Sequence, residues 1–162
     1  MTPPGDGVPP SLFRQLLGRF ATGVAVVTTT GPDDVPIGMT ANSVASVSLS
    51  PPLVLICIER SAALHDLLLA APRFAVNVLA EDQEELSRRF ATPDVARFDG
   101  VGYRLSERGL ALLDGAVAHI ECEQEAAHAA GDHTILLGRV VAGDAHEHRP
   151  LLYFRGGYTA LG

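Results

Sequence analysis

Hydrophobic residues along the chain follow two periods, and the first of them predicts a helix near the N-terminus. The residues that share the spacing of one helical face are Leu12, Phe13, Leu16, Leu17 and Phe20. Ser11 precedes them, where its hydroxyl can cap the first turn. Residues 1–10 are rich in Pro and Gly, so we expect a disordered N-terminal arm there and one folded domain over residues 11–162.

The second period is the alternation typical of β-strands, and it accounts for most of the remaining chain. Extended segments are predicted at residues 23–30, 37–48, 53–58, 73–79, 101–105, 116–127, 133–142 and 151–155. Residues 31–34 and 129–132 have the composition of turns, so each is expected to join its two flanking strands into a hairpin. The segment 53–58 is apolar throughout, which predicts a strand covered on both faces.

Two helical segments interrupt the strands. Ser61 can cap a helix that continues to Ala71, and residues 81–91 form another, with acids early and Arg88 and Arg89 late, as the helix macrodipole favours. Strands in hairpin order with a few helices between them predict a mainly β fold with flanking helices, arranged as a closed or split antiparallel barrel. A Rossmann arrangement is excluded because it needs regular strand–helix alternation and a glycine fingerprint after the first strand.

Residues 37–48 differ from an ordinary strand because they are small or hydroxylic and carry no charge. The segment reads Ile-Gly-Met-Thr-Ala-Asn-Ser-Val-Ala-Ser-Val-Ser. Small side chains let a ligand approach the backbone, and hydroxyls with the amide of Asn42 can bind a flat, polar or phosphorylated molecule. We interpret the segment as a strand with a ligand-binding edge, and a Ser/Thr-rich strand on a barrel surface remains the alternative.

The charge balance excludes several classes of function. The formal net charge is −7 and the pI is near 5.2, which argues against nucleic acid or an anionic membrane surface as the main partner. All 12 basic residues are Arg, so chemistry that needs a Schiff-base lysine or a P-loop lysine is excluded. The nucleophile motif GxSxG, the metalloprotease motif HExxH and a glycine-rich phosphate loop are also missing from the sequence.

Cysteine usage and the apolar runs bear on the cellular compartment. Cys57 and Cys122 lie far apart in apolar strand segments without CxxC spacing, so we expect them to be buried, reduced and unpaired in a cytoplasmic protein. Residues 1–10 lack the basic and apolar regions of a signal peptide. No run approaches the roughly 20 apolar residues of a membrane span.

Histidines are the first candidates for chemistry. His146 and His148 would share one strand face at metal-ligand spacing, yet no third ligand lies nearby in sequence, so no metal site is expected. His133 follows Gly131 and Asp132 at the tip of the second hairpin. A tight turn there could direct the imidazole across a cleft, although the same residues also suit an ordinary turn.

Arginines are the candidates for binding an anion. Arg60 and Ser61 lie where a strand meets the N-terminus of a predicted helix, so a guanidinium, a hydroxyl and free amides would converge there, as in a phosphate site. Arg89 and Phe90 end the next helix, and Arg155 follows the last strand. A surface or helix-terminal arginine is the alternative at each position.

Six short motifs occur in register along the chain. They are Gly-Met-Thr-Ala-Asn-Ser at 38–43, Ser-Val-Ser-Leu-Ser-Pro-Pro-Leu-Val-Leu at 46–55, Phe-Ala-Val-Asn-Val-Leu at 74–79, Phe-Ala at 90–91, Gly-Asp-His at 131–133 and Leu-Leu-Tyr-Phe-Arg-Gly at 151–156. Together, from about residue 11 to the C-terminus, they resemble the flavin reductase domain of short NAD(P)H:flavin oxidoreductases. The family fold is an FMN-binding split β-barrel, usually a homodimer with the flavin near the subunit interface.

The resemblance implies a flavin site whose residues are spread along the chain. The positions implied in cofactor binding are Met39, Thr40, Ala41, Asn42, Ser43, Ser46, Val47, Ser48, Arg60, Ser61, Arg89, Phe90, Tyr153 and Arg155. Residues 40–43 and 46–48 match positions that line the isoalloxazine and ribityl chain, and Arg60 and Ser61 match the phosphate region. His133 matches a histidine near the nicotinamide and is the implied catalytic residue, helping to place NAD(P)H over the flavin.

The implied activity is hydride transfer from a reduced nicotinamide to FMN or FAD, with NADH preferred and NADPH as the alternative donor. Reduced flavin would then pass to a separate flavin-dependent monooxygenase. An oxidase of the same fold that retains its flavin, and a non-catalytic flavin-binding protein, are the alternatives.

Overall fold

Strands are the main secondary structure in the computed structural model, which describes residues 5, 7–93 and 97–162. The helices are α1 (Pro10–Leu17), α2 (His65–Ala70) and α3 (Glu84–Ala91), with a 3₁₀ turn η1 (Pro32–Asp34). The strands are β1 (Thr22–Gly23), β2 (Ala25–Thr30), β3 (Pro36–Ala41), β4 (Val44–Leu49), β5 (Pro52–Glu59), β6 (Arg73–Val78), β7 (Tyr103–Leu105), β8 (Ala111–Leu113), β9 (Ala118–Ala130), β10 (His133–Ala145), β11 (Leu151–Phe154) and β12 (Gly157–Ala160). The predicted mainly β fold with flanking helices is confirmed.

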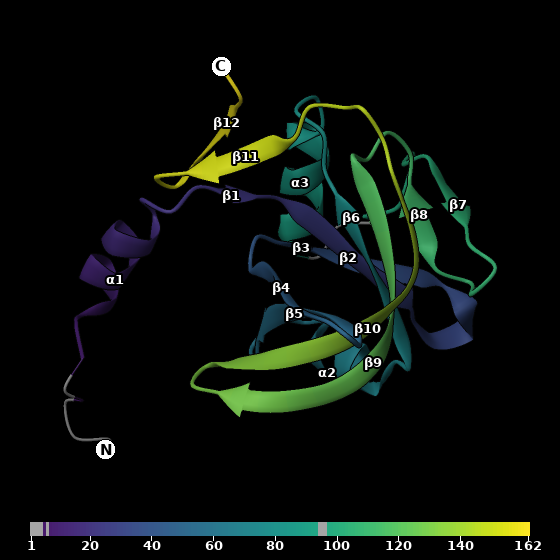
Figure 1. Ribbon diagram of the computed structural model, residues 1–162, viewed down its shortest axis with the longest axis horizontal. Helices are drawn as coiled ribbons and strands as arrows, with labels where there is room; N and C mark the ends of the chain where they lie inside the picture. The colour runs from purple at the N-terminus through teal and green to yellow at the C-terminus, as the bar shows by residue number, and fades with distance from the viewer. Residues whose placement is uncertain (1–4, 6, 94–96) are drawn as a thin grey trace.

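The main sheet is antiparallel and has the strand order β3-β2-β6-β9-β10-β5-β4 (Figure 1). Its end strands β3 and β4 are consecutive in the chain, and Asn42 and Ser43 alone separate them. Because three Cα–Cα steps span at most about 11 Å, the two edges must lie close together and the sheet must curl into a split barrel. We call this crossing at Asn42 and Ser43 the seam.

Hydrogen bonds to β5 hold the seam in place. The backbone N–H of Cys57 donates to the carbonyl oxygen of Ser43 at 3.2 Å. In the other direction, Ser43 Oγ donates to the carbonyl oxygen of Cys57 at 3.0 Å. The hydroxyl of a small residue thereby fixes the backbone where the chain passes from one edge strand to the other.

Alternate residues of the strands enter different hydrophobic cores. Val27 joins a core formed by β2, β5, β6, β9 and β10, whereas Val26 joins a second core with Phe90 of α3. Burying one such side chain stabilises the fold by about 1.5–3 kcal/mol. Packing in the first core is close enough to require a glycine in β10, because a Cβ added at Gly138 would lie 2.8 Å from Cβ of Cys122.

A buried amide ties three strands together. Asn77 Nδ2 of β6 donates to the carbonyl oxygen of Val26 at 3.0 Å and to Thr28 Oγ1 at 3.1 Å. Asn77 Oδ1 accepts the backbone N–H of Leu113 at 2.8 Å, which fixes the short strand β8 against the barrel. Asn77 is fully buried, so these bonds replace the hydration that the amide loses on folding.

The first predicted hairpin is correct in one half and wrong in the other. β2 pairs antiparallel with β3 along its full length. Residues 44–49 leave this pairing as β4 and pair instead with β5, from Val44 opposite Ile56. The prediction of one continuous strand over 37–48 is therefore wrong, because a local hairpin with the following apolar strand takes its second half.

The second predicted hairpin is confirmed and is longer than expected. β9 and β10 pair antiparallel around Gly131 and Asp132, with register shifts between Leu137 and Gly138 and between Val140 and Ala142. This long hairpin curves across the front of the barrel in Figure 1. At its tip, β10 begins with His133 opposite Glu59 of β5.

The helix starts differ from the predictions. α1 begins at Pro10 with Pro9 at the N-cap, so Ser11 is not its cap; proline suits the first helical position because its missing N–H would have no partner there. α2 begins at His65 and has no side-chain cap, so the predicted cap at Ser61 is wrong. Residues 59–65 form successive turns before the helix instead. Residues 1–4 and 6 of the expected N-terminal arm lie outside the described residues.

The apolar run 53–58 is covered fully on one face only. Val54, Ile56 and Ile58 are buried, whereas Leu55 and Cys57 are half-buried. Cys122 is buried as predicted, and both thiols are free, so the prediction of unpaired cysteines is confirmed. Cys57 is less buried than expected because its face of β5 is directed toward the seam.

The sequence patterns do not predict the short strands β8 and β12. β8 pairs with β7, and β12 pairs with β11 through Arg155 and Gly156, whose φ angles of 53° and 76° match a type I′ hairpin turn. Strands of three or four residues are too short for a recognisable alternation. Within the described ranges, no helix is both long enough and apolar enough to cross a membrane.

Candidate functional site

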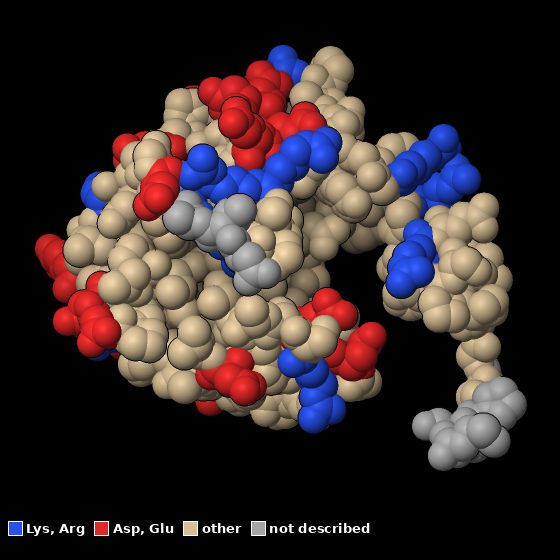
Figure 2. Space-filling model, turned by 180° about the vertical axis from the view of Figure 1, so that it is seen from behind, with Lys and Arg blue, Asp and Glu red and all other residues tan. Residues whose placement is uncertain are grey.

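A cavity of about 730 Å³ opens at the seam, between the barrel and α1. Its volume falls in the range of roughly 300–1,000 Å³ that is usual for small-molecule sites. The described residues that line it are Phe13, Arg14, Leu17, Gly18, Phe20, Thr22, Asn42, Ser43, Val44, Ala45, Leu55, His133, Tyr153 and Gly156. In Figures 1 and 2, α1 stands away from the body of the protein, with a wide hollow between them.

A second cavity of about 220 Å³ adjoins the first and shares Asn42 and Tyr153 with it. Its other lining residues are Val24, Thr40, Ala41, Ala91 and Tyr158. The seam therefore contributes to both cavities, and a ligand bound across Asn42 could occupy both. We call the two together the seam site.

Polar atoms without strong internal partners mark where a ligand could bind in the seam site. Thr22 Oγ1 is buried, and among the described residues it has no hydrogen-bond partner. A buried hydroxyl without a partner costs free energy, so this position favours a polar ligand atom or a water molecule. The side chain of Asn42 is exposed at the junction of the two cavities and offers both a donor and an acceptor.

His133 lines the seam site from the tip of the long hairpin. Its Nδ1 lies 2.7 Å from Oδ1 of Asp132, and the side chain is 42% exposed. The hydrogen bond and the charge of His133 hold the pKa of the Asp132 carboxyl below its usual value. Because an ionised carboxylate accepts only, Nδ1 is the donor, and Nε2 is the nitrogen that the ring can offer to a ligand.

Two tyrosines form the opposite wall. The rings of Tyr153 and Tyr158 meet edge to face, with centroids 5.4 Å apart. Tyr158 Oη lies 2.8 Å from Ser87 Oγ of α3, and Thr40 Oγ1 donates to the carbonyl oxygen of Ser87 at 2.6 Å. These bonds fix β3 and the C-terminal hairpin on α3, so the wall is rigid before any ligand binds.

The structure brings part of the predicted set together at the seam site. The predicted residues that line it are Thr40, Ala41, Asn42, Ser43, Tyr153 and His133. They come from β3, the seam, β10 and β11, which are far apart in sequence and meet only because the sheet curls.

Arg60 and Ser61 lie beside His133 rather than in the cavity lining. Both are exposed, and the backbone N–H of Arg60 donates to the carbonyl oxygen of Asp132 at 2.9 Å. The expected convergence with helix N-terminal amides is wrong, since α2 starts at His65. A guanidinium and a hydroxyl remain close to the outer rim of the site.

Met39, Arg89 and Phe90 support the site from behind. Met39 packs against the barrel core, and Phe90 is fully buried in the second core, where its ring meets that of Phe98 edge to face. Arg89 donates a hydrogen bond to the carbonyl oxygen of Asp99.

Residues 46–48 and Arg155 do not line the seam site: Ser46, Val47 and Arg155 are exposed, and Ser48 is half-buried. Ser46, Val47 and Ser48 belong to the end strand β4, whose register shifts between Ser46 and Ser48, and Val47 is 46% exposed. Arg155 lies in the turn of the C-terminal hairpin, where its backbone N–H donates to the carbonyl oxygen of Gly18 at 2.8 Å.

The sequence analysis missed several residues of the seam site. Thr22, Leu55 and Tyr158 line it, as does the apolar face of α1 that the helical period had assigned only to an amphipathic helix. The one signal in the sequence was the length of the apolar stripe, which continues to Phe20, just beyond the end of the helix. Contacts of Thr22 and Tyr158 depend on long-range pairing that no local pattern encodes.

Known proteins are similar to this chain over almost its whole length. The family model described as "Flavin reductase like domain" matches residues 17–162. The reductase subunit HsaB of a flavin-dependent monooxygenase from Mycobacterium tuberculosis is 40% identical over 157 residues, covering 95% of this chain and 83% of that protein. The FMN reductase (NADH) SmoA from Agrobacterium fabrum is 47% identical over 145 residues, covering 90% and 82%.

A solved structure agrees with the fold. The NADH:FAD oxidoreductase SgcE6 of Streptomyces globisporus, in complex with NAD and FAD fragments, superposes with a TM-score of 0.90 at 44% identity, covering 97% of each chain. The split-barrel architecture expected from the sequence is thereby confirmed.

Proposed function

The chain belongs to the flavin reductase like domain family, and we propose that it is an NADH:flavin oxidoreductase whose active site is the seam site. The observation that carries the assignment is the cavity at Asn42 and Ser43, where polar groups, an imidazole and a pair of tyrosines surround one space.

The residues present fit a flavin. A flat ring system with polar edges matches a cavity built from small side chains on one wall and tyrosines on the other. Thr22 Oγ1, buried and unpartnered within the described chain, supplies a hydroxyl for a ribityl or ring oxygen. The arginines near the rim, Arg14 and Arg60, can neutralise a phosphate.

Flavin, when bound, accepts a hydride from a reduced nicotinamide, and the protein supplies orientation and electrostatics. Asn42 and Ser43 would hold the ring edge by hydrogen bonds and would keep the backbone close to it. His133, fixed by Asp132, presents Nε2 toward the cavity, where it would position the nicotinamide. Tyr153 and Tyr158 exclude water from the inner end of the site.

A second copy of the chain completes the site. The apolar face of α1 is uncovered: Phe13, Leu16, Leu17 and Phe20 are 55%, 53%, 51% and 74% exposed. An isolated helix of eight residues is not stable in water by itself, and a partner surface would support it. Leu49, at the end of β4 that is remote from the seam, is 91% exposed and gives a second copy a further apolar surface to contact.

The test is a steady-state assay that crosses NADH and NADPH with FMN and FAD. Oxidation of the nicotinamide should require added flavin and should be faster with NADH than with NADPH. If neither FMN nor FAD supports NADH oxidation, the assignment is contradicted. Flavin binding without NADH oxidation also contradicts it and indicates a non-catalytic flavin carrier.

Reduced flavin should leave the protein and support a separate monooxygenase. Purified protein is then expected to be colourless after gel filtration and to drive a flavin-dependent monooxygenase when the two are mixed with NADH and flavin. A stoichiometrically yellow protein that keeps its flavin after dialysis indicates instead an oxidase of the same fold.

A further inference from the structure

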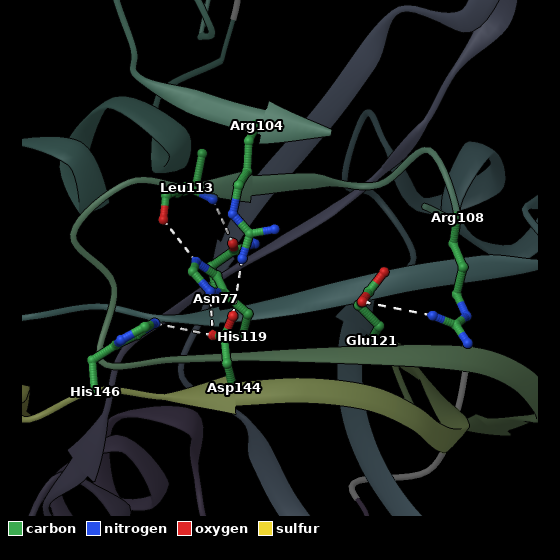
Figure 3. A network of polar contacts seen from close by, with 8 residues as sticks. All are labelled: Asn77, Arg104, Arg108, Leu113, His119, Glu121, Asp144 and His146. Atoms are coloured by element: carbon green, nitrogen blue, oxygen red, sulfur yellow. Dashed lines mark hydrogen bonds and ion pairs between the residues drawn. The ribbon is translucent and has the colours of Figure 1, made fainter. Parts of the chain in front are cut away.

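Three ionisable side chains meet at the end of the barrel where β9 and β10 lie next to the β7–β8 hairpin. His119 Nδ1 lies 2.7 Å from Asp144 Oδ1, and His146 Nε2 lies 3.1 Å from the same oxygen. One ligand atom of each residue falls within 4.8 Å of the others. In Figure 3 the three side chains are directed toward one another from β9, from β10 and from the turn after β10.

The fold supplies the ligands that the sequence pattern lacked. His146 and His148 alone predicted no metal site, because no third ligand lay near them in sequence. Pairing of β9 with β10 places His119 directly opposite Asp144, and the chain then turns so that His146 meets the same carboxylate.

The imidazole of His119 is held as metal-bound histidines usually are. His119 is 5% exposed, and its Nε2 lies 2.7 Å from the carbonyl oxygen of Leu113. A carbonyl oxygen only accepts, so Nε2 carries the hydrogen and Nδ1 is directed toward Asp144. Metal-ligating histidines typically donate their second N–H to a carbonyl or carboxylate in this way.

Asp144 presents one oxygen to the histidines and the other to an arginine. Arg104 donates to Oδ2 at 2.9 Å, which leaves Oδ1 to face both imidazoles. His119 Nδ1 and His146 Nε2 both face Asp144 Oδ1. Such contacts form either when each nitrogen carries a proton or when a cation lies between the three atoms.

We propose that His119 Nδ1, Asp144 Oδ1 and His146 Nε2 bind one divalent transition-metal ion of the zinc class, with solvent completing the coordination. Two imidazoles and a carboxylate are a common donor set for Zn²⁺, whereas Mg²⁺ and Ca²⁺ prefer oxygen ligands. Tetrahedral zinc ligands lie about 3.3 Å apart, so the contacts of 2.7 and 3.1 Å need to open by about 0.6 and 0.2 Å. His146 is exposed and can close the remaining distance.

The metal would cross-link β9, β10 and the segment that leads into β11. Its ligands line neither cavity of the seam site, so its role is structural. Binding of the ion to the folded chain is expected to raise the unfolding temperature with metal concentration.

The experiment uses the tag-free full chain after treatment with a chelator and dialysis. Calorimetric titration with Zn²⁺ is expected to give one saturable site, and Co²⁺ is expected to give visible d–d absorption bands. Mg²⁺ should give no binding heat. His146→Ala should weaken Zn²⁺ binding at least tenfold and remove the Co²⁺ bands.

His128→Ala is the matched control, because His128 is an exposed histidine at the opposite end of β9. It should bind Zn²⁺ like the wild type. Asp144→Asn preserves the shape of the side chain and should weaken binding as His146→Ala does. A wild type without saturable Zn²⁺ binding overturns the assignment, and so does a His146→Ala variant that binds as tightly as the wild type.

Discussion

At the scale of single residues, His133 lines the seam site from the tip of the long hairpin. Its Nδ1 is occupied by Asp132, so replacement removes the one nitrogen available to a nicotinamide while the cavity at Asn42 stays intact. We expect His133→Ala to lower kcat/KM for NADH by about 10–100-fold and to change the flavin Kd much less.

Steady-state kinetics and flavin fluorescence quenching measure the two effects of His133→Ala separately. His128→Ala, an exposed histidine in the same hairpin, should match the wild type in both. Equal losses of NADH use and flavin binding, or no loss of either, would contradict a positioning role for His133.

Ser43 should govern flavin binding itself. Its side chain lines the cavity and bonds to Cys57, so Ser43→Leu places extra volume where the ring edge is expected to lie. We expect the flavin Kd to rise about tenfold or more, because a side chain that overfills a shaped site costs about 1–3 kcal/mol. Thr159→Leu, on the exposed strand β12, is the control, and fluorescence titration is the measurement.

The two cysteines should differ in reactivity. Burial raises the pKa of the Cys122 thiol to about 12, so it stays protonated between pH 7 and pH 9, roughly the range of thiol assays. A chromogenic disulfide reagent should therefore titrate at most one thiol in the native protein and two in urea. Cys57→Ser should abolish the native reaction, and rapid reaction of two native thiols would show that the core around Cys122 opens.

At the scale of elements, α1 is the segment whose packing is least complete within one chain. Converting part of its apolar face to charge should disrupt contact with a second copy. We expect Leu16→Glu to shift the protein from dimer to monomer in sedimentation or light-scattering measurements and to lower flavin affinity. Gln15→Glu adds charge on the same helix outside the apolar stripe and should leave the dimer unchanged.

Asn77 should matter more to stability than any exposed amide. Asn77→Ala removes bonds that join β6, β2 and β8 and leaves buried partners unsatisfied. We expect a loss of about 1–3 kcal/mol in the free energy of unfolding, measured by urea denaturation. Asn42→Ala makes the same chemical change at an exposed position and should cost far less, whereas similar losses at both positions would contradict the importance of the buried network.

Elements were predictable from the sequence where local chemistry determines them, and not where distant strands compete. Gly131 and Asp132 encode a turn, so the long hairpin follows from its own residues. The break at Asn42 is invisible because alternation continues beyond it, and only pairing with β5 ends the strand. Contact between His119 and Asp144 depends on strand register, since a shift of one residue would turn a side chain to the other face.

At the scale of the whole molecule, the candidate site was predictable in its seam residues and in His133, which a family resemblance identified together. Tyr158, Thr22 and α1 were not, because they reach the seam through the C-terminal hairpin and through β1, whose pairing partner β11 lies more than a hundred residues away. Curling of the sheet brings these distant segments together.

The seam has a consequence for how fast a bound molecule enters and leaves the site. β3 and β4 are the two ends of the sheet, so a molecule bound between them enters and leaves without breaking the backbone ladder of any paired strands. Release of the bound molecule then requires no unfolding of the sheet. A barrel whose binding site lies between its two edge strands can stay rigid while a bound molecule enters and leaves.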